Sequence, residues 1–144
     1  MVGPDTQRLI DFTEPVAVLF LSVGHSIVDD ANVRSMLATI NDAIVSGSYV
    51  AFTQMVATSQ AAADDVNRVA GELRLEWKTR LASDVVGFLD GFEPIEPGLL
   101  NITEWRPDPD QPPLAPVHEP LQPFLGASAK SQRYHEFGGL LKKP

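Results

Sequence analysis

The most constraining feature of the sequence is the apolar run PVAVLFLSV at residues 15–23, which Gly24 follows. It is rich in Val, Leu and Phe and lacks polar alternation, a pattern typical of a strand covered on both faces in a parallel sheet. The run is far shorter than the roughly 20 residues that a membrane-spanning helix needs. We therefore predict a buried strand at 16–23, and we expect neither a membrane anchor nor a signal peptide.

A helix and a second strand follow. Asp29 and Asp30 offer N-cap oxygens, and apolar residues then recur at helical spacing as far as Ile44. Gly47 is the expected C-cap of this helix. The β-rich segment at 48–56 predicts the second strand. A strand, a helix and a strand in this order form a βαβ unit with two parallel strands.

The rest of the chain predicts further helices, two strands and a loop. We expect a helical turn or two at 5–12, a helix from Ser59 to Trp77 or Arg80, another from Ser83 to Gly91, and strands at 98–105 and 134–141. Seven of the 12 prolines lie between the last two strands. Because proline fixes φ and cannot donate a backbone hydrogen bond, we predict an extended loop at about 107–131.

Charge and composition exclude several classes of function. The formal net charge of −8 repels phosphate backbones, so we expect no nucleic-acid binding. The absence of cysteine excludes disulfides and thiolate metal sites and agrees with a cytoplasmic protein. The three histidines, His25, His118 and His135, are scattered along the chain, so we expect no metal site.

Four segments carry a resemblance to a known family. They are PVAVLFLSVGHSIVDD at 15–30, GSYVAFTQ at 47–54, RLASDVVGFLDGFEPIEPGLLNITEWRPD at 80–108 and FGGLLKKP at 137–144. Their order and spacing resemble S-adenosylmethionine-dependent methyltransferases, whose Rossmann-like class I domain is an α/β fold with a seven-stranded sheet. The resemblance implies that the four strands here are the fourth to seventh of that sheet. They would lie in the order four, five, seven, six, with the last strand antiparallel and helices on both faces.

The resemblance also implies that residues 1–144 form only the C-terminal half of such a domain. Strands one to three would lie upstream of Met1. The parent activity would be methyl transfer from S-adenosylmethionine to an acceptor that the sequence does not identify. Because no G-x-G-x-x-G turn occurs in the sequence, we expect the chain alone to bind S-adenosylmethionine weakly or not at all.

The expected site residues share one position, the carboxyl ends of the first two strands, where open α/β sheets bind ligands. They are Ser22, Val23 and Gly24 for the cofactor, His25 for catalysis, and Thr53 and Gln54 for the substrate. His25 could orient or deprotonate the acceptor because its pKa ordinarily lies near neutrality. Alternatively, His25 only hydrogen-bonds the following loop, and Thr53 and Gln54 are ordinary strand-end residues.

A hydrolase is a second interpretation. The segment LSVGHSIV at 21–28 places G-x-S between a strand and a helix, as in the nucleophile elbow of α/β-hydrolases. Ser26 would be the nucleophile, and His118 or His135 the base. The orienting acid would be one of three aspartates, Asp84, Asp90 and Asp108. Val28 argues against this interpretation, because the elbow needs a small residue two positions after the serine.

A third interpretation is non-enzymatic. A strand at 16–23 that has lost its neighbour exposes an unpaired edge, which favours pairing with another chain. The partner would be a second copy of the chain or the missing N-terminal half. The chain would then be part of a split enzyme, a dimer, or an inactive remnant of a truncated gene.

Overall fold

The computed structural model describes residues 3–106, 108–113, 115–125 and 133–144. Its α-helices are α1 (Pro4–Leu9), α2 (Asp30–Ala43), α3 (Gln60–Glu72) and α4 (Ala82–Val86). The 3-10 helices are η1 (Gly24–Ser26), η2 (Ile102–Glu104) and η3 (Glu119–Phe124). The strands are β1 (Ala17–Leu21), β2 (Tyr49–Ala57), β3 (Arg80–Leu81), β4 (Glu93–Pro94), β5 (Leu100–Asn101) and β6 (Tyr134–Lys142). Over the described ranges, no helix has the length and apolar character to cross a membrane.

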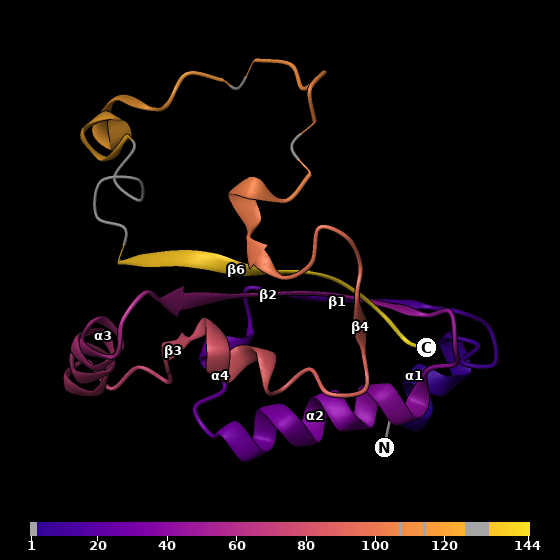
Figure 1. Ribbon diagram of the computed structural model, residues 1–144. Helices are drawn as coiled ribbons and strands as arrows, with labels where there is room; N and C mark the ends of the chain where they lie inside the picture. The colour runs from indigo at the N-terminus through magenta and orange to yellow at the C-terminus, as the bar shows by residue number, and fades with distance from the viewer. Residues whose placement is uncertain (1–2, 107, 114, 126–132) are drawn as a thin grey trace.

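The strands form one sheet in the order β1-β2-β6-β4, with β3 beside β2 and β5 beside β6 (Figure 1). β1 runs parallel to β2, whereas β6 runs antiparallel to β2, β4 and β5. If β5 is taken as the third predicted strand, this is the expected order four, five, seven, six with the last strand antiparallel. The predicted α/β fold is therefore confirmed.

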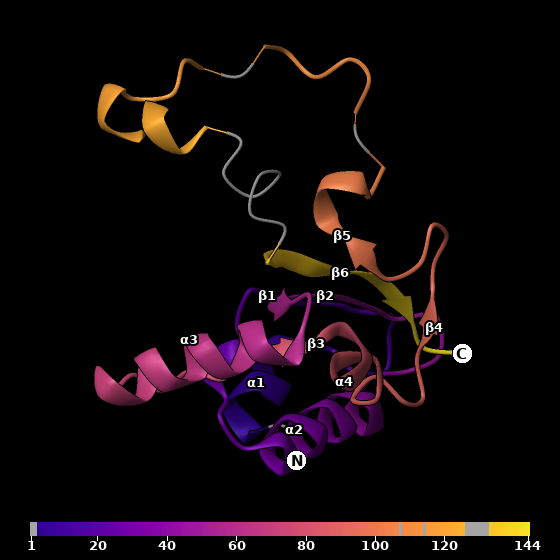
Figure 2. The same ribbon diagram turned by 60° about the vertical axis from the view of Figure 1, so that its left-hand side comes forward.

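The two faces of the sheet are covered differently. Helices α1 to α4 lie on one face, and the segment that contains β5 and η2 lies on the other (Figures 1 and 2). Helical segments thus occur on both sides, but those on the second side are 3-10 helices. On the α-helical side, Val50 and Phe52 are fully buried and share a core with Leu37 of α2.

The free face of β1 departs from the prediction of a strand covered on both sides. Leu19 is 71% exposed and Leu21 is 48% exposed, whereas Phe20 between them is buried. Alternation of exposed and buried side chains is typical of a strand with one covered face. In the described part of the chain, β1 pairs with β2 along one edge and with no strand along the other.

Two glycines in β6 allow the neighbouring backbones to approach closely. A Cβ at Gly138 would collide with the carbonyl oxygen of Phe52 and lie 2.7 Å from the Cα of Thr53. A Cβ at Gly139 would lie 3.0 Å from the Nε1 of Trp105. The predicted strand at 134–141 is confirmed, and its glycines are needed for packing rather than merely weakening it.

Several predicted boundaries are wrong. α3 ends at Glu72 instead of Trp77 or Arg80, and Arg74 then adopts a left-handed φ of 55°. α4 ends at Val86 rather than Gly91. Its N-terminus is capped by Asp84, which accepts from the Leu81 N–H at 3.1 Å, and not by Ser83.

Other corrections concern turns and short strands. α2 ends at Ala43, so Gly47 lies beyond its C-cap, in a turn with a φ of 87°. The strand expected at 98–105 is reduced to β5, because the Asn101 side chain accepts from the Thr103 N–H and starts η2. The two-residue strands β3 and β4 were not predicted.

The described part of the proline-rich loop, residues 108–113 and 115–125, has no strand and contains η3. η3 projects away from the sheet (Figure 2). The rest of the loop predicted at 107–131, namely residues 107, 114 and 126–131, lies outside the described residues.

Substitution of Gly138 by alanine tests the close approach of β2 and β6. The new Cβ would meet backbone atoms that cannot rotate away, so we expect Gly138→Ala to lower the free energy of unfolding by about 3 kcal/mol. Gly71 in α3 is the matched control, because a Cβ there meets nothing within 4 Å. Gly71→Ala should raise stability by about 0.5–1 kcal/mol. Urea unfolding followed by circular dichroism measures both; equal stability of Gly138→Ala and wild type would contradict the prediction.

Candidate functional site

Ser22 turns the chain at the carboxyl end of β1. It has a left-handed φ of 54°, and its N–H donates to the Thr53 carbonyl oxygen at 2.8 Å and to the Thr53 Oγ1 at 3.0 Å. This turn ends β1 and places two expected site residues side by side.

Gly24 packs directly on the side chain of Gln54. A Cβ at Gly24 would collide with Gln54 Oε1 and lie 3.1 Å from its Cδ. Gln54 is fully buried, and neither polar atom of its amide has a hydrogen-bond partner among the described residues. The absence of a side chain at Gly24 therefore allows close contact with Gln54 within the protein. Binding roles for these two residues stay predictions.

His25 fills a gap in the sheet. β1 pairs with β2 only as far as Thr53, and β3 pairs with β2 from Val56 onward. Between these positions, Nδ1 of His25 accepts from the Met55 N–H at 3.4 Å. His25 is 6% exposed, and its ring lies against the ring of Trp77 with 3.9 Å between the centroids. A side chain thus takes the place of a neighbouring strand.

The environment of His25 favours the neutral form of the ring. Burial lowers the pKa of His25; the carboxylate of Glu136 opposes this shift, and the positive charge of Arg80 adds to it. Because Nδ1 accepts a hydrogen bond, the proton of the neutral ring is assigned to Nε2. A ring in this form has no free acceptor for a substrate proton. The geometry favours the alternative of a locally bonded histidine, and catalysis by His25 stays a prediction.

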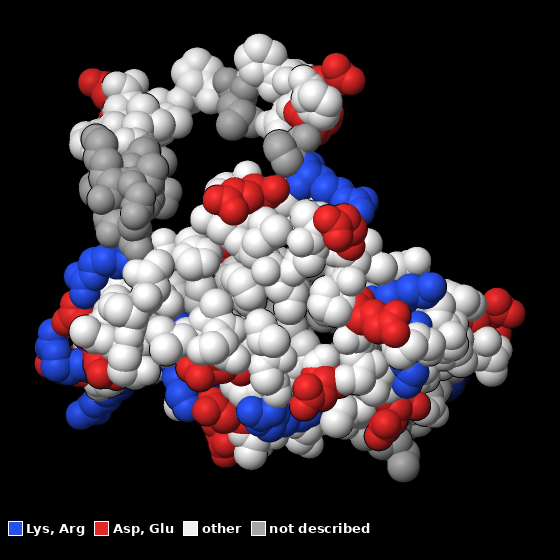
Figure 3. Space-filling model, viewed as in Figure 1, with Lys and Arg blue, Asp and Glu red and all other residues white. Residues whose placement is uncertain are grey.

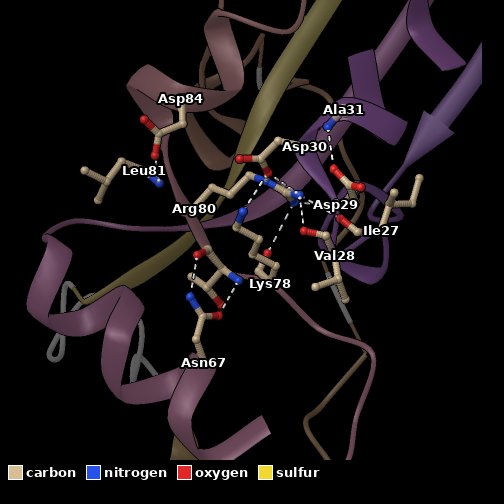
Figure 4. Close-up of polar contacts among 12 residues, drawn as sticks. Ile27, Val28, Asp29, Asp30, Ala31, Asn67, Lys78, Arg80, Leu81 and Asp84 are labelled. Carbon is tan, nitrogen blue, oxygen red and sulfur yellow. Dashed lines mark hydrogen bonds and ion pairs between the residues drawn. The ribbon is translucent and has the colours of Figure 1, made fainter. Parts of the chain in front are cut away.

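Arg80 also holds the loop at 22–28, through hydrogen bonds to its backbone. It is 3% exposed and forms an ion pair with Asp30 at 2.8 Å (Figure 4). Its Nη1 donates to the carbonyl oxygen of Gly24 at 3.0 Å, and its Nη2 donates to that of Ile27 at 2.7 Å. A second, longer bond from Nη2 reaches the Val28 carbonyl oxygen at 3.3 Å. A buried guanidinium thus donates hydrogen bonds to three backbone carbonyl oxygens of this loop.

Arg80 belongs to a short segment, residues 77–80, that we call the strap. The Lys78 N–H donates to the carbonyl oxygen of His25 at 2.7 Å, and Lys78 Nζ donates to Asp30 at 2.9 Å. Asn67 of α3 anchors the strap through two hydrogen bonds with the backbone of Thr79, at 2.7 and 3.0 Å (Figure 4). The strap therefore ties α3 to the loop at 22–28.

Asp30 is the anionic partner of both strap cations. Its burial opposes ionisation, but hydrogen bonds and charge from Lys78 and Arg80 outweigh this effect and lower the pKa of Asp30. Asp29 caps α2 by accepting from the Ala31 N–H at 2.8 Å. Both aspartates were predicted to start α2. In the structure, Asp29 caps the helix, whereas Asp30 binds the strap.

Sequence reasoning missed the strap. Arg80 and Trp77 lie in a segment predicted as the end of a helix, and no motif or periodicity marks either residue. The available signal was an Arg followed by a Leu within the segment that resembles the methyltransferases, which indicates a position but not a contact.

A hollow of about 360 Å³ lies on the opposite face of the sheet. It is lined by Ala51, Thr53, Ile102, Trp105, Gly139 and Leu140. Trp105 is held there by a hydrogen bond from its Nε1 to the Gly98 carbonyl oxygen at 3.1 Å. Of the expected site residues, Thr53 alone lines this hollow.

The hydrolase triad is not assembled. No hydrogen bond of the described residues joins Ser26 to His118 or His135. His118 precedes η3, away from the sheet, and His135 in β6 packs edge-on against Phe137 at 6.4 Å. The acids are elsewhere: Asp84 caps α4, Asp108 accepts from the Asp110 N–H at 2.9 Å, and Asp90 is exposed.

Charged groups of both signs are mixed on one face of the molecule (Figure 3). On the face shown in Figure 3, Lys and Arg side chains lie beside Asp and Glu side chains along the helical side, and they do not gather in one basic patch. Within the described ranges, no group of three or more His, Asp or Glu side chains could hold a metal ion.

Acid should weaken the fold through His25. Because burial lowers its pKa in the folded chain below the ordinary value of about 6.5, the unfolded chain takes up the proton more readily. The free energy of unfolding should therefore fall as the pH drops below about 6.5. Protonation would also turn Nδ1 into a donor that faces the Met55 N–H. His25→Asn is the control, since its Oδ1 can accept that hydrogen bond without titrating. Urea midpoints at several pH values should show a smaller loss on acidification for the variant, and an equal loss would refute the prediction.

The contact between Gly24 and Gln54 can be tested by a double-mutant cycle. Gly24→Ala should destabilise the chain by about 1–3 kcal/mol through overpacking. In the Gln54→Ala background the same change should cost much less, because the obstructing amide is gone. If the changes in the free energy of unfolding of the two single variants simply add in the double variant, positions 24 and 54 are not in contact.

Comparisons with known proteins agree with the α/β fold. The sequence pattern described as S-adenosyl methyltransferase matches residues 1–144. A crystal structure of a candidate methyltransferase from Thermobifida fusca YX is similar, with 27% identity and a TM-score of 0.71 over 99% of this chain and 48% of the other. A DUF574 family protein from Streptomyces avermitilis MA-4680 has 21% identity and a TM-score of 0.69, over 99% of this chain and 49% of its own.

The chain therefore spans about half the length of the solved structures that it matches. No curated protein matches it. The resemblance found in the sequence is confirmed, and the chain belongs to the S-adenosyl methyltransferase family.

Proposed function

We propose that the chain forms one half of an S-adenosylmethionine-dependent methyltransferase domain and is inactive without the other half. The parent reaction forms a bond from the acceptor to the methyl carbon as the bond from sulfur to that carbon breaks. The protein's part in such a direct displacement is chiefly alignment. The observation that carries the proposal is the open edge of β1, whose carboxyl end leads into the loop at 22–28.

The surroundings of β1 support a missing neighbour. Leu19 and Leu21 are exposed on its free face. A hollow of about 340 Å³ lies between α1, β1 and α2. It is lined almost wholly by apolar side chains, among them Ile10, Val18 and Ile40. Unpaired edges and apolar surfaces of this kind favour a further strand and its covering helix. We assign this position to the complementary half of the domain.

Within this proposal the expected site residues take distinct roles. Ser22, Val23 and Gly24 present their backbone at the carboxyl end of β1, where a cofactor would lie in a completed cleft. Thr53 lines a hollow open to an acceptor, whereas Gln54 supports Gly24 from within the core. His25 then orients the loop, because its Nδ1 is bonded to the Met55 N–H. The lack of cysteine fits a reaction in the cytoplasm.

Self-association is the competing use of the same edge. An exposed edge strand can pair with its equivalent in a second copy. Light scattering of the isolated chain distinguishes a monomer, which leaves the edge available for a complementary half, from a dimer that occupies it.

Titration calorimetry with S-adenosylmethionine tests the proposal. The isolated chain should show no saturable binding, because the sequence has no Gly-rich turn to hold the cofactor. A chimera in which the chain replaces the matched half of the Thermobifida fusca protein should bind in the micromolar range. Micromolar binding by the isolated chain, or a folded chimera that does not bind, would contradict the proposal.

The chimera also offers a control for the edge. Leu19→Asp places a charge on the exposed face of β1 without touching the core of the isolated chain. The variant should leave the stability of the isolated chain nearly unchanged but weaken cofactor binding by the chimera. If both halves meet elsewhere, the chimera should tolerate this change.

A further inference from the structure

We propose that Arg80 is a positioning residue that fixes the loop at 22–28 and thereby sets one wall of the ligand cleft. Its consequence for ligand binding rests on the proposed function, whereas its effect on the loop is a property of this chain alone. The residue lies in β3, more than fifty positions after the loop in sequence, and β3 pairs with the same edge of β2 as β1 does.

The contacts of Arg80 use the whole guanidinium. Nε donates to the Asp30 carboxylate at 2.8 Å, Nη1 to the carbonyl oxygen of Gly24, and Nη2 to those of Ile27 and Val28. A guanidinium presents its donors in a rigid planar fork, whereas a lysine ammonium is a single point. Arginine can therefore hold three separated carbonyl groups and a carboxylate at once, and lysine cannot.

Burial makes these hydrogen bonds consequential. The side chain of Arg80 is 2% exposed, and the ring of Phe88 lies 5.3 Å below its guanidinium carbon. A buried cation without partners is costly, and so is a buried carbonyl group without a donor. Loss of Arg80 would therefore leave the loop carbonyl groups unsatisfied, and the loop would have to move to reach water.

Few other contacts hold the loop in its place. Ser22 binds Thr53 at its start, and His25 binds Met55 and Lys78 near its middle. Within the described residues, the backbone carbonyl oxygens of Ile27 and Val28 accept hydrogen bonds only from Arg80. Ile27 also packs against the hydrophobic core, so Arg80 is the main polar restraint on the second half of the loop.

The loop position matters for the proposed reaction. Ser22, Val23 and Gly24 occupy the carboxyl end of β1, and a displacement of about 1 Å in a reacting group can slow catalysis by orders of magnitude. A rigid arginine outside the ligand cleft would keep this backbone in place without touching the ligand. Arg80 is accordingly a positioning residue and not a catalytic one.

Hydrogen exchange measured by mass spectrometry on the full chain tests the proposal. Arg80→Lys keeps the charge but loses the fork, so exchange of peptide 22–28 should become roughly tenfold faster or more, with peptide 49–57 unchanged. Arg34 is the matched control, because it also lies over Phe88, at 4.7 Å, and donates to the Gly87 carbonyl oxygen. Arg34→Lys should leave peptide 22–28 unchanged.

Two outcomes would overturn the role of Arg80. One is loop exchange in Arg80→Lys within about twofold of wild type, and the other is an equal acceleration of both peptides, which indicates general destabilisation. If Arg80→Lys does not fold, Asp30→Asn is the second variant. It removes the anionic partner of Arg80 but keeps the hydrogen bonds from Arg80 to the loop carbonyl groups. Hydrogen exchange should still become faster in peptide 22–28 than in peptide 49–57. Equal exchange in both peptides of that variant counts against the proposal.

The pKa of His25 distinguishes movement of the loop from a change in the charge at position 80. Arg80→Lys retains the positive charge near His25, so charge repulsion on the ring persists. If the loop is released, burial of the ring is lost, and the pKa of His25 followed by NMR should rise toward its ordinary value. An unchanged pKa of His25 would mean that the ring, and the loop with it, has not moved.

The chimera with the Thermobifida fusca half links the loop to ligand binding. Arg80→Lys in the chimera should weaken S-adenosylmethionine binding by roughly tenfold, and Arg34→Lys should not. Unchanged binding in Arg80→Lys would overturn the effect on the cleft. If the wild-type chimera does not bind, the proposed function fails, and hydrogen exchange on the chain alone still decides whether Arg80 fixes the loop.

Discussion

Nine consecutive residue pairs join β2 to β6, from Tyr49 opposite Lys142 to Ala57 opposite Tyr134. Every other described strand is attached to one member of this pair. The pairing requires Gly138, since a Cβ there would meet the backbone of β2. It also presents the buried side chains of β2 to α2 and α4, so the core and the positions of β1 and β3 follow from it.

The edge of β2 that does not pair with β6 is covered by two strands and a side chain. β1 covers its first half, β3 covers its last residues, and the ring of His25 fills the interval. The strap, which ends at Arg80 in β3, binds the loop at 22–28 through Lys78 and Arg80. A side chain can replace a strand here because one ring nitrogen accepts from the Met55 N–H, which keeps this backbone group satisfied.

Sequence patterns predicted the parts of the fold that depend on local periodicity. The apolar run at 16–23, the helix after Asp29 and the strand at 134–141 all occur, because each buries a regular set of side chains. Patterns failed where single contacts decide, as at Arg74, whose left-handed φ follows the end of α3, and at Asn101, which starts η2. The candidate site divides in the same way. Strand ends located Ser22 and Thr53, whereas the partners of Arg80 are distant in sequence and leave no periodic signal.

The glycines of β6 have a consequence for the hollow beside Thr53. Gly139 contributes main chain rather than a side chain to its lining, and the opposite wall is formed by Ile102 and Trp105. The backbone of Gly139 is held in place by the pairing of β6 with β2, so this part of the lining cannot change its rotamer. The size of molecule that the hollow admits would therefore change through side chains such as Ile102 and Trp105, and not through Gly139.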